Sequence, residues 1–362
     1  MCFVSSSQRP KEPHSEFEIR IRIFDWSGHN AIGDDLLSWA TRRSLADAAA
    51  SLGAPIEFCR WWGYQASVCG GGTIFGHGVF FKRMARRIAF DGKPYIVFGS
   101  GARKPDRDLD ARERDSLRKF CEGARLIGVR GPGTKNWLES YGIQQVEVVG
   151  DAALTFKPVE VPDMPGDFKV GVNLRHMGGG LRSEEQLSSN RRNVELFAHL
   201  CDEIVRRYRA TLYFFDFCRN RLDSDLTAIR GVLAGMIERE AAAAAKILSF
   251  EENKHPVVAF SRLGRMDFVL SQRMHPALMA WVQGVPSIGI EYQFGKTYDA
   301  FAPLELQSFV LSIADMNVDQ YMEKMELVLD QESALVDQCR AKVQDLSFRQ
   351  RKFLQRFLSK LT

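Results

Sequence analysis

The sequence lacks the cysteine pattern of a disulfide-rich or zinc-binding protein. Its seven cysteines among 362 residues are scattered, odd in number and without a CxxC pair. Disulfide frameworks and zinc sites need an even number of cysteines or closely spaced ligand pairs. We therefore expect reduced thiols, no structural metal and an intracellular protein.

Long hydrophobic runs are missing as well. The first residues contain no apolar segment of a signal peptide's length, which is roughly 7–15 residues. Elsewhere no stretch reaches the roughly 18 uninterrupted apolar residues that cross a membrane. A secreted or membrane-spanning protein is not expected, and the prediction is a cytoplasmic one.

Charge of one sign is not in large excess either. Lys and Arg number 49 against 45 Asp and Glu, a formal net charge of +4. Because nucleic-acid-binding proteins concentrate basic residues on a patch or stripe, no nucleic-acid partner is expected. Charged residues make up 26% and hydrophobic residues 45% of the chain. This composition is that of globular domains and excludes a disordered or collagen-like chain.

The sequence does contain a repeated alternation of apolar strands and amphipathic helices. Strand patterns at 19–24, 95–99 and 125–129 are separated by segments with helical spacing. Such alternation is typical of a parallel α/β sheet. A Pro-rich segment at 157–167 interrupts the pattern, which restarts at 168–174. Since domains average about 150 residues, the chain is predicted to form two of them.

We therefore predict an α/β protein in which two Rossmann-like domains face each other across a cleft, followed by a long C-terminal helix. Within the second domain, the apolar run at 257–260 is predicted as a strand. The predicted segments are a disordered N-terminus at 1–16, a first domain at 17–156, a linker at 157–167, a second domain at 168–318 and a helical segment at 319–362.

The C-terminal segment is strongly basic. Residues 340–360 hold seven Lys and Arg side chains against one acidic residue, Asp345. One interpretation is a long helix packed across the two domains. The other is a basic face that contacts anionic lipid headgroups at the inner side of the cell membrane. Both interpretations stay open.

Glycine-rich loops follow several predicted strands, and ligands of open α/β sheets bind beyond the carboxyl ends of the strands. In the first loop, 28–35, Asp34 or Asp35 can cap the next helix, and Asp34 can alternatively deprotonate a hydroxyl. The loop at 69–78 contains three consecutive glycines whose amides suit a phosphate or carboxylate. It has neither the P-loop lysine nor the GxGxxG spacing of dinucleotide-binding proteins.

Two further strand ends carry polar residues. The loop at 99–106 contains Ser100, which can reach a ligand. In the next one, Arg130 follows a strand and precedes a Pro-Gly turn into a helix. An arginine at such a place can bind a phosphate or carboxylate with two hydrogen bonds, although a surface ion pair is an equal alternative.

The most informative segment is 267–301. A predicted strand delivers Arg273 and His275 to its carboxyl end, and the helix that follows directs its positive N-terminal dipole to the same place. Lys296 follows the next strand. Two cations and a titratable imidazole therefore converge, which is what binding and protonating a small, highly anionic substrate requires.

Taken together, these motifs resemble those of the polysaccharide pyruvyl transferase family. The resemblance covers about residues 25–305 and departs at Gly131, where the family often has Asp. The shared features are NxGDD (Asn30, Gly33, Asp34, Asp35), GGG (70–72), GxG (Gly99, Gly101), VR (Val129, Arg130), VGD (149–151) and S-x-R-[ML]-H…G-[VI]-P…Y…K…F (271–301).

The resemblance implies a fold like that of GT-B glycosyltransferases. It also implies transfer of the enolpyruvyl-derived unit of phosphoenolpyruvate (PEP) to two hydroxyls of a sugar, which yields a pyruvate ketal and phosphate. The sugar belongs to a polysaccharide, such as an exopolysaccharide, or to its lipid-linked precursor. PEP is then a co-substrate, and neither a cofactor nor a metal is expected.

The same resemblance places the acceptor on the first domain and PEP on the second. His275 is the expected acid, because an imidazolium beside anions is charged near neutral pH, and Asp34 is the expected base, with Asp151 and Glu291 as alternatives. The expected PEP-binding residues are Arg273, Lys296, Arg130, Gly71 and Gly72. The expected acceptor-binding residues are Asn30, Asp35, Ser100, Glu291 and Tyr292.

Two other functions stay open. A GT-B glycosyltransferase would use the same strand-end cations for the diphosphate of a nucleotide sugar. A catalytically idle relative would serve as a scaffold in polysaccharide assembly, although it would have no need to keep Arg273, His275 and Lys296 together. Activity with a nucleotide sugar and none with PEP would distinguish the first of these from pyruvyl transfer.

Overall fold

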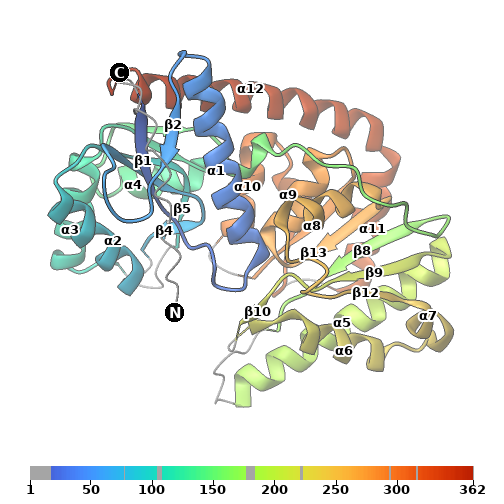
Figure 1. Ribbon diagram of the computed structural model, residues 1–362. Helices are drawn as coiled ribbons and strands as arrows, with labels where there is room; N and C mark the ends of the chain where they lie inside the picture. The colour runs from blue at the N-terminus through green and yellow to red at the C-terminus, as the bar shows by residue number, and fades with distance from the viewer. Residues whose placement is uncertain are drawn as a thin grey trace, which may run out of the picture.

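The computed structural model contains two parallel sheets with helices packed around them, as Figure 1 shows. The N-terminal segment 1–16, predicted to be disordered, lies outside the part of the chain that the structure describes. That part consists of residues 18–76, 78–103, 108–176, 184–220, 223–292, 295–314 and 317–361.

The first sheet is seven-stranded with the order β2-β1-β3-β5-β6-β7, and β4 pairs with β5. Every pairing in it is parallel, as the alternation of strands and helices predicts. Its strands are β1 (Ile19–Phe24), β2 (Ile56–Phe58), β3 (Ala66–Gly70), β4 (Thr73–Phe75), β5 (Tyr95–Ala102), β6 (Ile127–Val129) and β7 (Val146–Val148). Its helices are α1 (Ile32–Ala50), α2 (Gly78–Asp91), α3 (Ala111–Gly123), α4 (Pro132–Glu139) and the short η1 (Ala152–Thr155).

The second sheet has six parallel strands in the order β12-β9-β8-β13-β14-β15. These strands are β8 (Lys169–Asn173), β9 (Thr211–Phe215), β12 (Lys246–Leu248), β13 (Phe268–Ser271), β14 (Ser287–Glu291) and β15 (Val310–Ser312). A small hairpin pairs β10 (Arg219–Asn220) with β11 (Asp223–Ser224). The helices are α5 (Glu184–Tyr208), α6 (Asp225–Gly235), α7 (Arg239–Ala244), α8 (Pro256–Ser261), α9 (Met274–Val282), α10 (Lys296–Phe301), α11 (Val318–Asp330) and α12 (Glu332–Leu358), with short η2 (Arg262–Arg265), η3 (Ala302–Leu304) and η4 (Gln307–Phe309).

The prediction of a strand at 257–260 is wrong, because these residues form helix α8. Pro256 occupies the first turn of that helix, a position that proline favours. The run is apolar on all sides because α8 lies between the two halves of the molecule, where α1 packs against it. A short, largely buried helix and a buried strand have similar compositions.

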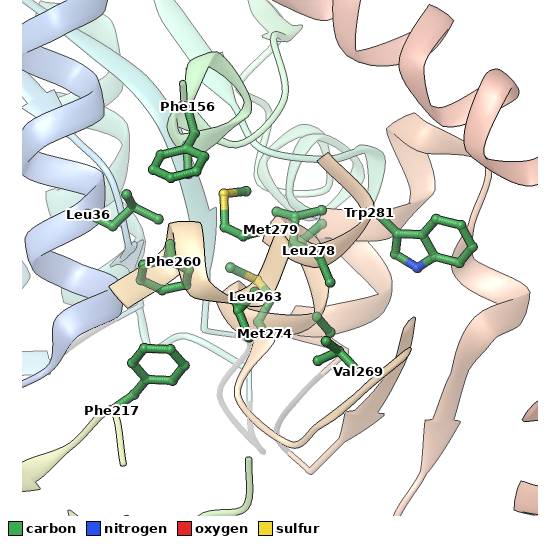
Figure 2. Packing of buried hydrophobic residues seen from close by; sticks show 14 of the residues in the cluster. Leu36, Phe156, Phe217, Phe260, Leu263, Val269, Met274, Leu278, Met279 and Trp281 are labelled. Atoms are coloured by element: carbon green, nitrogen blue, oxygen red, sulfur yellow. The ribbon is translucent and has the colours of Figure 1, made fainter. Parts of the chain in front are cut away.

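One hydrophobic cluster joins the two halves. In Figure 2, Leu36 of α1 and Phe156 lie toward Phe260 of α8 and Met279 of α9. All four side chains are buried. Since burial of each such side chain stabilises by about 1.5–3 kcal/mol, the two halves are held in one arrangement by apolar packing, and the cleft between them has a defined shape.

The C-terminal helix α12 has 27 residues and lies across both halves, in contact with α1 and η1 of the first and with α9 and η3 of the second (Figure 1). Its buried Gln350 donates hydrogen bonds to the carbonyl oxygens of Val149 and Asp151, at 3.0 and 2.8 Å. The helix thereby holds the loop that follows β7.

Much of the positive charge of α12 is neutralised. Four of its basic residues form ion pairs, namely Arg340 with Asp337, Lys342 with Glu305, Arg349 with Asp345 and Arg356 with Glu147. Through the part of the chain that the structure describes, no helix is both long and apolar enough to cross a membrane.

Candidate active site

A small cavity of about 70 Å³ lies between the two halves, at the start of α1 on one side and at the starts of α9 and α10 on the other. Five of the residues expected from the sequence to catalyse or to bind substrate line it, with Asp34 from the first half and four from the second. The full lining consists of Ala31, Gly33, Asp34, Phe217, Phe260, Arg273, Met274, His275, Pro276, Tyr292 and Lys296.

Backbone contacts fix the start of α1 against the second half. Ala31 pairs with Cys218 in an isolated antiparallel bridge, and the amide of Ile32 donates to the carbonyl of Phe217 at 3.0 Å. Asn30 has a left-handed φ of 57°, a conformation that asparagine tolerates better than most residues. Its side chain is exposed, and Asn30 is absent from the cavity lining. The Asn30 backbone therefore shapes the entry to α1.

Asp35, the other carboxylate of the NxGDD motif, holds the same loop closed. Its Oδ1 accepts a hydrogen bond from the amide of Gly28 at 2.7 Å. The two adjacent carboxylates are thus separated by position, since Asp34 lines the cavity and Asp35 braces the loop.

Arg273 is held in place by a fully buried carboxylate that the sequence did not indicate. Its Nε lies 3.0 and 2.9 Å from the two carboxylate oxygens of Asp225, and its Nη2 lies 2.7 Å from Oδ1. Asn173 at the end of β8 donates to Asp225 at 3.0 Å and accepts from the backbone amide of Arg273 at 3.3 Å. This network fixes the direction of the guanidinium and offsets part of its charge.

His275 lies in the first turn of α9 and is buried, with 7% of its surface exposed. Gly33 packs directly on its ring, since a Cβ at that position would come within 2.6 Å of Nδ1. On the other side of the ring, Nε2 lies 3.7 Å from Oδ2 of Asp151. The imidazole is therefore enclosed by groups of the first half while its backbone belongs to the second.

Behind His275, Asp151 also faces Arg130. Nη1 of Arg130 lies 3.7 Å from Oδ2 of Asp151, and both side chains are fully buried. The guanidinium fits because Gly101 has no side chain, and a Cβ there would collide with it. Within the described part of the chain, none of the three guanidinium nitrogens makes a hydrogen bond. Arg130 is absent from the cavity lining, so it lies behind the cavity.

The two carboxylates near His275 have pKa values shifted in opposite directions. Burial raises the pKa of Asp34, and the nearby charges of Lys296, His275 and Arg273 offset only part of that effect. Burial also acts to raise the pKa of Asp151. There, however, the contact with His275, the charge of Arg130 and the amide of Ala153 together hold the pKa below its ordinary value.

Lys296 is the first residue of α10 and makes no ion pair with any residue whose position the structure describes. Tyr292, at the same rim, accepts a hydrogen bond from Arg175 through its hydroxyl at 2.7 Å. Glu291 is buried and its Oε2 accepts from the amide of Thr297 at 2.6 Å. The Glu291 side chain thus caps the start of α10.

Gly71, Gly72 and Ser100, which were singled out from the sequence, are absent from the cavity lining. The amide of Gly71 donates to the carbonyl of Phe98 at 3.2 Å, so this amide is already used within the sheet. Gly72 lies beside Asp34, because a Cβ on Gly72 would be 3.9 Å from Oδ1 of Asp34. The Ser100 side chain is fully buried and donates to Phe98 at 3.4 Å.

The glycine at position 131 has a structural explanation. A Cβ there would collide with the backbone carbonyl of Asp299. The carboxylate of Asp299, from α10, accepts hydrogen bonds from the amide of Thr134 at 3.1 Å and from its hydroxyl at 2.5 Å. The second half therefore supplies the carboxylate at the start of α4, and Gly131 provides the space for it.

Comparison with solved structures shows a GT-B-like fold and nothing more, because the sequence identities are low. The chain is similar to a putative UDP-N-acetylglucosamine 2-epimerase from Listeria monocytogenes (TM-score 0.57, 11% identity, covering 90% of this chain and 91% of that one). It is also similar to Anabaena HepE in complex with UDP (TM-score 0.54, 8% identity, covering 95% of this chain and 100% of that one). A third similar structure is a glycosyltransferase from Rickettsia africae (TM-score 0.51, 10% identity, covering 96% of this chain and 99% of that one).

No curated protein matches the sequence at a significant level. A family model described as polysaccharide pyruvyl transferase, by contrast, matches residues 29–293. This match covers well over half of the chain and contains Asp34, Asp151, Arg273 and His275. The chain belongs to the polysaccharide pyruvyl transferase family.

Proposed function

We propose that the protein transfers the enolpyruvyl-derived unit of PEP to two hydroxyls of a sugar in a polysaccharide or its lipid-linked precursor. The product is a pyruvate ketal, and phosphate is released. The observation that carries the proposal is the convergence of Arg273, His275 and Lys296 in one small cavity opposite Asp34.

PEP carries a carboxylate and a phosphate, so its site needs several positive groups that do not move. Lys296 lines the cavity, and Asp225 holds Arg273 in a fixed direction. The start of α9 adds the partial positive charge of its N-terminal amides. We infer that these groups bind PEP.

The proposed reaction begins with proton transfer from His275 to the methylene carbon of PEP. The adjacent carbon, C2, becomes electrophilic, and the oxygen of a sugar hydroxyl forms a bond to it. The bond between C2 and the phosphate oxygen then breaks, and a second hydroxyl of the sugar closes the ketal. Of the two hydroxyl protons, one replaces the proton that His275 gave to the methylene carbon, and the other leaves with the phosphate.

Asp34 is the proposed base for the attacking hydroxyl. A base is most effective when its pKa lies close to the working pH, and burial moves the pKa of Asp34 upward from that of an ordinary carboxyl. Asp151 is less suited to the role, because its lowered pKa makes it a weak base and it faces His275 and Arg130. Its proposed role is to position the imidazole.

The cavity as it stands has room for a small anion rather than for a sugar as well. The acceptor would therefore approach from the side of the first half, along the loop at 28–35 and the glycine-rich loop beside Asp34. Asn30 and Asp35 belong to the loop at 28–35, and Tyr292 lines the cavity from the second half. We propose that they shape this approach rather than react.

The test is to incubate the protein with isotope-labelled PEP and an oligosaccharide or lipid-linked acceptor. We expect phosphate release together with transfer of label to the acceptor, and neither with the His275→Ala variant. Phosphate release without labelled acceptor would mean that PEP is only hydrolysed. Nucleotide release from a UDP- or GDP-sugar, with no turnover of PEP, would instead identify a glycosyltransferase.

A further inference from the structure

The first half exposes three large aromatic side chains on one surface. Trp61 and Trp62 lie in the loop between β2 and β3 and are 56% and 79% exposed, and Phe90 near the end of α2 is 82% exposed. A single exposed hydrophobic residue is ordinary, whereas a group of large ones marks an interaction site.

Arginine side chains connect these aromatic residues. The guanidinium carbon of Arg87 lies 5.6 Å from the ring of Trp62 and 5.8 Å from that of Phe90. Arg60 lies 5.7 Å from the ring of Trp61. Such distances are typical of cation–π contacts, so the loop and the helix end form one continuous surface.

This surface has a rigid base. The hydroxyl of Tyr64 donates to Asp91, and Nε of Arg87 lies 3.0 Å from the same carboxylate. Nη1 of Arg22, a buried side chain, lies 3.8 Å from it, and Nζ of Lys93 donates to the carbonyl of Tyr64. The charge of Asp91 is thus directed inward, and the loop is fastened to α2.

The surface is also positively charged. Residues 58–90 contain five Lys and Arg and not a single Asp or Glu. Three of the basic residues, Lys82, Arg83 and Arg86, are exposed on α2. Lys82, Arg86 and Phe90 recur every four residues and so lie on one face of the helix. We name the set Arg60, Trp61, Trp62, Lys82, Arg83, Arg86, Arg87 and Phe90 the aromatic–basic surface.

We propose that the aromatic–basic surface binds an anionic lipid membrane. Tryptophan is enriched at the level of the lipid headgroups, where its ring is partly buried and its N–H stays wet. Lysine and arginine beside it are attracted to anionic headgroups. Exposed aromatic side chains on the loop and on the end of α2, with basic side chains between them, suit a protein that lies on a membrane without crossing it.

This assignment differs from the membrane contact considered from sequence, which involved the basic residues at 340–360. In α12 most of the cations are paired with acidic side chains and the helix packs on both halves. Figure 1 shows α2 at the outer side of the first half, away from α12. The proposal does not depend on the chemistry of the cavity.

The test is co-sedimentation of the full chain with vesicles of neutral phosphatidylcholine alone or mixed with anionic phosphatidylglycerol. We expect binding to the mixed vesicles that weakens with salt, and a blue shift of tryptophan fluorescence on binding. The Trp62→Ser/Phe90→Ser variant is expected to bind about tenfold or more weakly, a ratio that corresponds to about 1.4 kcal/mol. Arg83→Glu/Arg86→Glu is expected to abolish binding.

The matched control is Arg351→Glu/Lys352→Glu, which reverses two exposed charges of α12 and is expected to leave vesicle binding unchanged. Loss of binding in this control alone would overturn the proposal in favour of α12. Absence of binding to the anionic vesicles would overturn it outright. So would a dimer in sedimentation velocity that dissociates in the Trp62→Ser/Phe90→Ser variant, because a second copy of the chain would then cover the surface. None of these outcomes bears on turnover of PEP.

Discussion

The two walls of the cavity differ in kind. The second half contributes cations and an imidazole on the starts of two helices, each held by its own scaffold. The first half contributes carboxylates, Asp34 at the cavity and Asp151 behind His275. Each wall alone lacks groups that the other supplies, and the proposed proton transfers need both. The site therefore exists only where the halves meet, and the apolar core between them keeps it assembled.

The two carboxylates of the first wall differ from each other as well. Burial raises the pKa of Asp34, whereas His275, Arg130 and the Ala153 amide overcome burial at Asp151 and lower its pKa. Environments that push two carboxyl groups apart in pKa commonly separate a group that exchanges protons from one that stays charged. The difference favours Asp34 as the base and Asp151 as the permanent partner of the imidazole.

Removing the proposed acid from the second wall is expected to have the largest effect on turnover. His275→Ala is expected to lower kcat by about 10³-fold, within the range for loss of an acid or base, while PEP still binds. The control is His255→Ala, an exposed histidine at the start of α8, which should behave as wild type. Steady-state kinetics and PEP titration check both, and full activity of His275→Ala would remove His275 as the acid.

Removing the proposed base is the next largest effect. Asp34→Asn is expected to lower kcat/KM by about 10²-fold. Because the base must be ionised, activity should fall as the pH drops through the raised pKa of Asp34. In the folded state a raised carboxyl pKa favours the neutral form, so its contribution to stability is present at low pH and lost as the pH rises through that pKa. Asp34→Asn is therefore expected to have a higher Tm than wild type at neutral pH, and a lower Tm would contradict the assignment.

On the opposite wall, Lys296→Ala tests anion binding without touching proton transfer. We expect PEP affinity to fall by about 10- to 100-fold, as for loss of one charge-assisted hydrogen bond of 1.5–3 kcal/mol. Lys254→Ala, at an exposed lysine, serves as the control and should leave the affinity unchanged. Calorimetric titration with PEP measures both, and equal affinities would remove Lys296 from the PEP site.

The smallest expected effect on turnover comes from the positioning carboxylate. Asp151→Asn leaves Arg130 buried without its counter-charge, and the expected loss of stability is about 3–5 kcal/mol in urea unfolding. Turnover should fall by about tenfold with PEP affinity retained. Since the pKa of Asp151 is lowered, the stability that it contributes is present at neutral pH and lost as the pH falls through that pKa. A variant that is active and fully stable would contradict a positioning role.

Much of the fold could be predicted from local pattern. The alternation of apolar strands with helices indicates two parallel sheets, because strands buried on both faces are apolar throughout. The run at 257–260 could not be assigned, since α8 is buried between the halves and has the composition of a strand. Its neighbours in space, not in sequence, decide its conformation.

Site residues that directly follow a strand could be predicted from the sequence. Contacts between residues that lie far apart in the chain could not. Arg273, His275 and Lys296 follow strands of one sheet, so their convergence follows from topology. The pairing of Arg273 with Asp225 joins residues 48 positions apart, and that of His275 with Asp151 joins the two halves. The space needed at Gly131 depends on Asp299 in the same way. No local signal in one sequence carries such contacts.

The most direct measurement is a thermal-shift titration of the purified protein with PEP, in parallel with UDP- and GDP-sugars. A ligand that binds only the folded state stabilises it by about 2.7 kcal/mol at a hundredfold excess over Kd. We predict a rise in Tm with PEP that is clearly smaller in Lys296→Ala and retained in His275→Ala. A rise with a nucleotide sugar and none with PEP would contradict it.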